Sequence, residues 1–283
     1  MKSSNPVFAR SAEFNGRGSA TTVNDPSQWQ VDLNGSPVSS PTHTEPGVGR
    51  MTIDSVVEKT GLTLALLTVA AAVTWFAIGD VIDPTTGEAT MGKAATFATL
   101  GALIGFVLAM VNSFKKVISP ALVLAYAVFE GVFIGAFSKV IAAYVGDTSI
   151  VFQAVLGTVV AFAGTLAAYK FFNIQVTDKF RKIMTISGFA IVGVLLINLL
   201  LSVTGVFESG GLRGFNTLGL LVSCALVVYA TFMLIMDFDY AEKGIEAGLP
   251  ERESWRVAFG LTVTLVWLYI EILRILAILR GDN

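Results

Sequence analysis

The chain has 283 residues and a formal net charge of −2; 54% of its residues are hydrophobic and only 14% are charged. Soluble domains carry about 25% charged residues, so this composition excludes a water-soluble fold. The slight negative charge argues against nucleic acid as a partner. The sequence therefore predicts an integral membrane protein surrounded by a lipid bilayer.

Residues 1–50 differ from the rest of the chain. The stretch from Asn15 to Gly49 is rich in Ser, Thr, Pro, Gly, Asn and Asp, and its few apolar residues form no stripe. Such a segment buries too little apolar surface to offset the entropy lost on ordering. No apolar core of a secretory signal follows Lys2. We expect a disordered cytoplasmic tail over 1–50 and a transmembrane domain over 51–283.

Seven apolar runs follow, and each is long enough to cross a hydrocarbon core of ~30 Å. Backbone groups in lipid need hydrogen-bond partners within their own segment, so all seven runs are predicted to be helices. A β-barrel is excluded because its strands would alternate apolar with polar residues. The expected fold is an all-α bundle with spans at 61–78, 94–111, 120–140, 150–172, 183–203, 218–236 and 257–279.

The distribution of Lys and Arg predicts the orientation. With the N-terminus in the cytoplasm, fourteen of these residues lie inside and four outside, or eleven against four without the three distant tail residues Lys2, Arg10 and Arg17. The outer four are Lys93, Lys139, Arg213 and Arg280, while Arg274 lies within the seventh span. We expect a multi-pass protein of the plasma membrane with its C-terminus outside.

Glycine recurs at four-residue spacing as Gly101/Gly105 and Gly131/Gly135. Small residues one turn apart let helix backbones approach closely. The favoured interpretation is packing within the chain, and a dimer interface is the alternative; the oligomeric state stays open.

Residues for catalysis are scarce. His43 is the only histidine and lies in the tail, and Cys224 is the only cysteine, so neither a Ser–His pair within the membrane nor a multi-thiolate zinc site is available. No Gly-rich phosphate loop ends in Gly-Lys-Ser/Thr. We therefore expect neither an enzyme nor a bound cofactor.

Four acidic residues lie at or near membrane depth: Glu130 in the third span, Asp237 and Asp239 at the end of the sixth, and Glu271 in the seventh. A charge at the bilayer centre costs at least ~2.5–3.5 kcal/mol, so each should face protein, water or a partner. Structural roles are open to all: Glu271 and Arg274 could neutralise each other, the aspartates could be solvated, and Glu130 could be a protonated acid bonded to a backbone carbonyl.

The functional alternative is that acids from spans six and seven converge inside the bundle. Two carboxylates at hydrogen-bond distance cannot both ionise cheaply, so one would hold a proton. Their oxygens are also suitable ligands for Ca²⁺. Such a pair could act as a latch that opens when the charges separate.

The segment 236–240 (Met-Asp-Phe-Asp-Tyr) and the segment 268–276 (Leu-Tyr-Ile-Glu-Ile-Leu-Arg-Ile-Leu) resemble the C-terminal signature of the Bax inhibitor family. Residues 120–137, with Tyr126 and Gly131, are similar to the third helix of that family. The resemblance covers about residues 55 to 280, and the opening 3–8 with its hydrophilic tail resembles an actinobacterial branch.

The resemblance implies a seven-helix fold with the last helix surrounded by the other six, and bacterial members that leak Ca²⁺ in a pH-dependent way. The family's sensor is a pair of aspartates, which match Asp237 and Glu271. Family members can also carry an arginine at the end of helix two that pairs with the first aspartate, and the matching position in this chain lies near Lys115. This chain departs by having Glu in span seven, no acid in span two and a longer loop over 241–256.

Depth along the helices sets a condition on this pair. At ~1.5 Å per residue, Asp237 lies ~5 Å and Glu271 ~21 Å from the inner boundary. They meet only if span six continues past Tyr240, span seven begins below the membrane, or helix tilt closes the gap.

Two functions follow as expectations. The first is a pH-sensitive cation leak, with Ca²⁺ the expected ion, gated by Asp237 and Glu271, which are also candidate Ca²⁺ contacts. Asp239, Glu130, Arg274 and Lys115 are accessory candidates. The alternative is a regulator without transport activity that binds a membrane protein, such as a protease, through its tail and the charged loop 237–256.

Overall fold

The computed structural model describes residues 49–81, 91–172, 174–206 and 210–281. The described chain contains seven helices long and apolar enough to cross a membrane, which confirms the predicted class. Apart from its last two residues, the segment 1–50 lies outside the described residues. The helices are α1 (Ile53–Ile78), α2 (Gly92–Phe114), α3 (Pro120–Val145), α4 (Ser149–Phe171), α5 (Asp178–Val203), α6 (Thr217–Glu246) and α7 (Ser254–Gly281), with 3-10 turns η2 (Gly211–Arg213) and η3 (Glu251–Glu253).

α3 continues five residues beyond its predicted span, to Val145. The other main extensions lie at the end of the bundle where α1, α3, α5 and α7 begin. We call this the basic end, because the eleven Lys and Arg of the sequence count lie there. α1 begins at Ile53 because the Thr52 and Ser55 side chains form a reciprocal capping box. The Thr177 side chain caps α5 in the same region. α6 continues past Met236 to Glu246, so the two aspartates of its motif lie within the helix.

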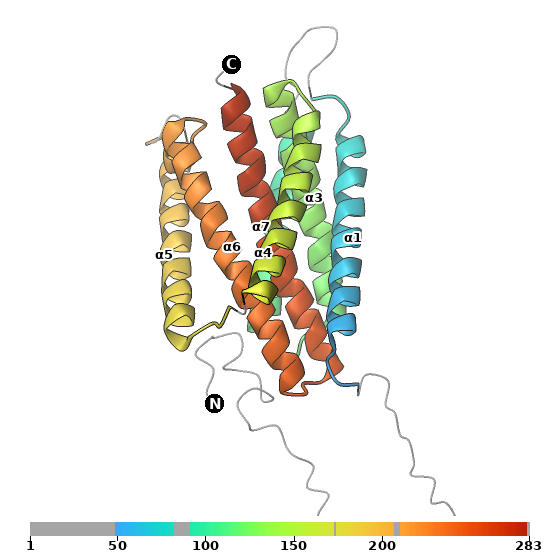
Figure 1. Ribbon diagram of the computed structural model, residues 1–283. Coiled ribbons are helices and arrows are strands. Elements are labelled where there is room, and N and C mark those ends of the chain that lie inside the picture. The colour runs from blue at the N-terminus through green and yellow to red at the C-terminus, as the bar shows by residue number, and fades with distance from the viewer. Residues whose placement is uncertain (1–48, 82–90, 173, 207–209, 282–283) are drawn as a thin grey trace, which may run out of the picture.

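α7 lies in the middle of the bundle (Figure 1). It packs mainly against α1, α3, α4 and α6. In its most apolar stretch 67% of the residues are buried, whereas the corresponding figure for α5 is 6%. α5 lies at the edge and contacts α6 and η2. The predicted central last helix is confirmed, and a polar side chain on α7 is therefore enclosed by protein.

α3 lies between α1 and α2, and glycine permits the close approach. A Cβ at Gly131 would lie 2.4 Å from the Leu67 carbonyl oxygen, and one at Gly135 would lie 2.3 Å from that of Ala71. On the other face, a Cβ at Gly101 would lie 2.6 Å from the backbone nitrogen of Phe133. Both glycine pairs serve packing within the chain, as predicted.

Candidate functional site: ionisable groups along the central helix

Polar side chains follow one another along α7 from the basic end to the opposite end. Arg256, Thr264, Glu271 and Arg274 are all buried, with 1 to 6% of each residue exposed. Apolar side chains such as Leu268 and Leu273 separate them. Because a charge in such surroundings is costly, each ionisable group requires a partner, and these partners define the site.

Glu271 forms an ion pair with Arg213. The Glu271 Oε1 lies 2.6 Å from a guanidinium nitrogen of Arg213, and Glu271 is 1% exposed. Its other oxygen, Oε2, has no hydrogen-bond partner among the described residues. A buried carboxylate with one free oxygen is a strong hydrogen-bond acceptor and can take a proton or a cation.

Arg213 comes from the link between α5 and α6 rather than from a helix. It ends the 3-10 turn η2, which follows Gly210 at φ 78°. The buried Asn198 of α5 fixes this turn: its amide nitrogen donates to the Gly210 carbonyl (3.2 Å) and its oxygen accepts from the Leu212 backbone N–H (2.8 Å). The α5–α6 link is thereby positioned to hold a guanidinium against the central helix.

Arg274 supports the same link. It donates to the Arg213 carbonyl oxygen at 2.6 Å, and its guanidinium lies 5.1 Å from the centre of the Phe215 ring. No ion pair joins Arg274 to Glu271 among the described side chains, where Glu271 pairs with Arg213 instead. Arg274 therefore acts on the link that carries the ion-pair partner of Glu271.

Asp237 lies nearer the basic end. It accepts a hydrogen bond of 2.7 Å from the Thr264 hydroxyl, and a Cβ at Gly260 would lie 3.6 Å from its Oδ1. Thr264 and Glu271 are seven residues apart on one continuous helix, about 10 Å along its axis. The structure does not bring Asp237 and Glu271 together. The extension of α6 past Tyr240 does not close the gap, because Asp237 faces the first turns of α7.

The accessory candidates have separate surroundings. Asp239 is buried and binds Arg181 of α5 as well as Lys243, whose Nζ lies 2.8 Å away, so it is no solvated helix end. Glu130 packs against α2, its Oε2 2.9 Å from the position of a Cβ at Gly105. Lys115 is exposed, and no ion pair joins it to Asp237 among the described residues.

A buried ion pair fixes the start of α7. Arg256 and Glu253 are joined at 2.6 Å and are 4% and 5% exposed. The same guanidinium donates to the carbonyl oxygens of Lys115 (3.4 Å) and Lys116 (2.9 Å), in the link between α2 and α3. Arg256 therefore connects α7 to the link between α2 and α3. The sequence pattern did not single out this residue.

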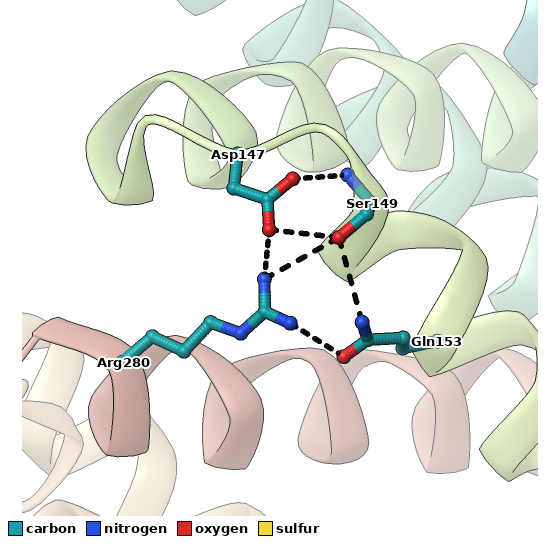
Figure 2. A network of polar contacts seen from close by, with 4 residues as sticks. All are labelled: Asp147, Ser149, Gln153 and Arg280. Atoms are coloured by element: carbon teal, nitrogen blue, oxygen red, sulfur yellow. Dashed lines mark hydrogen bonds and ion pairs between the residues drawn. The ribbon is translucent and has the colours of Figure 1, made fainter.

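The far end of α7 is tied to the turn between α3 and α4 (Figure 2). Arg280 binds Asp147, and its guanidinium also donates to the Gln153 side chain at 2.9 Å. The pKa of Asp147 lies below its usual value because the Ser149 hydroxyl and backbone N–H donate to its carboxylate, with a further contribution from Arg280. This network is exposed and holds the end of the helix in place.

No cluster of three or more His, Cys, Asp or Glu side chains able to hold a metal ion occurs in the part of the chain that the structure describes. The site is instead a series of single carboxylates, each held by a different element: Thr264 beside Asp237 and Arg213 beside Glu271.

A family model described as Bax inhibitor 1 like matches residues 5–281. A comparison with curated proteins finds no match. The matched range includes all seven membrane-spanning helices and both carboxylates of the site. The chain is a multi-pass membrane protein and belongs to the Bax inhibitor 1 like family.

Proposed function

We propose that this protein is a pH-sensitive cation leak, with Ca²⁺ the expected ion and no enzymatic activity. The observation that carries the proposal is the position of Glu271. It lies on the central helix with 1% exposure, and its only ion-pair partner among the described residues is Arg213 of the α5–α6 link. An ionisable group held inside a membrane bundle is costly, and such groups mark ion or proton pathways.

The ion pair gives the proposed gate a closed state. A charged Glu271 holds the guanidinium of Arg213 and with it the turn η2 against α7. A proton on Glu271 removes the charge that attracts Arg213, so the link loses one of its two attachments to the central helix and keeps the hydrogen bond from Arg274. Proton uptake is therefore expected to open the end of the bundle opposite the basic end.

Asp237 is the second carboxylate of the proposed pathway. It lies between α6 and α7 near the basic end, where the Thr264 hydroxyl binds it. A cation that enters from that end meets Asp237 first and Glu271 after two further turns of α7. Carboxylate and hydroxyl oxygens are hard ligands that suit Ca²⁺.

Ca²⁺ flux into liposomes tests this proposal. The purified protein is reconstituted with a Ca²⁺-sensitive dye inside, and the external pH is stepped between 8 and 6. We expect flux to rise on acidification, Glu271→Gln to conduct at both pH values, and Asp237→Asn to reduce flux. Asp178→Asn, an exposed acid in the first turn of α5, is the matched control and should behave like wild type.

Two results would refute the proposal. One is the absence of flux from protein that remains folded after reconstitution. The other is a pH response that is the same in wild type, Glu271→Gln and Asp237→Asn.

A further inference from the structure

A cavity of about 550 Å³ lies at the basic end, outside the series of carboxylates. Residues of α1, the α2–α3 link, η3 and the start of α7 line it. Three of its lining side chains are cationic, Lys59, Lys115 and Arg252, and one, Glu251, is anionic. The cavity is of the size that binds small ligands and carries a surplus of positive charge.

Two of the three cations are available to a ligand. Lys59 is buried and its Nζ lies 2.7 Å from Glu251, so these two charges neutralise each other. Lys115 and Arg252 are exposed and form no ion pair with any described residue. The hydroxyl of Ser119, at the N-cap of α3, makes no capping hydrogen bond and is a further donor beside the positive end of that helix.

The wall that carries Lys115 is rigid. The buried Arg256 donates to the carbonyl oxygens of Lys115 and Lys116. The buried Asn112 donates to the Leu122 carbonyl at 3.1 Å across the same link. The cationic side chains therefore project from a backbone that is held before any ligand arrives, which lowers the entropy cost of binding.

The surroundings favour a lipid over a soluble anion. Trp255, Val117 and Ile118 also line the cavity, and tryptophan is typical of the interface between headgroups and acyl chains. Val117 is 45% exposed and Phe114, at the end of α2, is 52% exposed. A molecule with its phosphate in the cavity would find apolar surface for its chains next to it.

We propose that this cavity binds the phosphate-bearing headgroup of an anionic phospholipid from the leaflet at the basic end. Lys115 and Arg252 bind the phosphate, the Ser119 hydroxyl donates to it, and the acyl chains lie along the exposed face near Phe114. Basic recesses between helices at a membrane face recognise such headgroups, since anionic lipid is attracted by each added cation.

Native mass spectrometry of the full chain in detergent tests this proposal. Phosphatidylglycerol or phosphatidylcholine is titrated against wild type, the double variant Lys115→Gln/Arg252→Gln, and the control Lys170→Gln/Lys179→Gln. The control removes two exposed lysines at the same end that do not line the cavity. We expect wild type and control to retain one phosphatidylglycerol in preference to phosphatidylcholine, and the double variant to bind it roughly 10- to 30-fold more weakly.

Three outcomes would overturn the proposal. Equal weakening in the control pair would assign binding to the general charge of the surface. Equal retention of phosphatidylglycerol and phosphatidylcholine would show that the cavity does not recognise the headgroup. Displacement of phosphatidylglycerol by millimolar inorganic phosphate would identify a site for soluble anions. If the double variant does not fold, the single variants Lys115→Gln and Arg252→Gln replace it, each with an expected loss of about fivefold.

Discussion

The ion pair between Arg213 and Glu271 can be tested by removing its cationic member. Glu271 is 1% exposed, and in the variant Arg213→Gln its carboxylate loses its only ion-pair partner among the described residues. The hydrogen bond from Arg274 to residue 213 is retained, because it is accepted by the backbone carbonyl. The variant therefore tests the guanidinium group alone, because it removes that group and leaves the backbone contact in place.

The magnitude follows from the burial of the pair. Removing one partner of a buried ion pair typically costs about 3–5 kcal/mol, since the other charge is left without compensation. We expect Arg213→Gln to lower the free energy of unfolding by about 3–5 kcal/mol at pH 7.

The assay is unfolding by sodium dodecyl sulfate in dodecyl maltoside micelles, with wild type and variant compared at pH 7. In the background of Glu271→Gln the same substitution removes no charge pair, so it should cost less than about 1 kcal/mol. Lys93→Gln, an exposed lysine at the same end of the bundle, should cost nothing measurable. A loss below about 1 kcal/mol in the native background, or a full loss in the Glu271→Gln background, would refute the reasoning.

Three further predictions concern the packing and the ends of α7. Gly135→Leu places a Cβ 2.3 Å from the Ala71 carbonyl oxygen and should lower the free energy of unfolding by about 3 kcal/mol or prevent folding. Gly164→Leu should fold normally, because no atom of the described residues lies within 4 Å of a Cβ at that position. Arg256→Met leaves a buried glutamate unpaired and should cost about 3–5 kcal/mol in the same unfolding assay. The pKa of Asp147 is lowered, so the contribution of its carboxylate to the stability of the fold is present above about pH 4 and is lost only below that value. Asp147→Asn should therefore leave the pH profile of Ca²⁺ flux between about pH 6 and 8 unchanged.

The sequence predicted the number and approximate position of the helices because the thickness of the bilayer sets the length of each span. The need to satisfy backbone hydrogen bonds in lipid makes each span a helix. α3 continues five residues past its predicted end on the opposite side, but the largest errors fell at the basic end. There α1, α5 and α6 continue beyond the apolar runs as helices made of polar residues, which hydropathy does not register. The Thr-x-x-Ser box at Thr52 and the threonine at 177 were the signals for two of these starts.

The sequence also identified Asp237 and Glu271 as enclosed acids but not their partners. Arg213 was counted as an outer charge, because nothing in its sequence neighbourhood shows that the α5–α6 link turns back onto α7. Thr264 lies among apolar residues of α7, and nothing in that pattern indicates that it binds Asp237. Pairs between residues 27 or 58 positions apart depend on tertiary packing, which one sequence does not reveal.

The separation of the two carboxylates has a consequence for how they act. Thr264 and Glu271 lie on one unbroken helix, so Asp237 can reach Glu271 only if α6 slides along α7 by about two turns. Such a shift would break the Thr264 bond and the α6–α7 packing together. We therefore expect the two acids to act as independent sites. The effects of Asp237→Asn and Glu271→Gln on the logarithm of Ca²⁺ flux should add in the double variant, as for sites more than 7–10 Å apart. A double variant equal to either single one would show instead that the two acids meet as a pair in the conducting state.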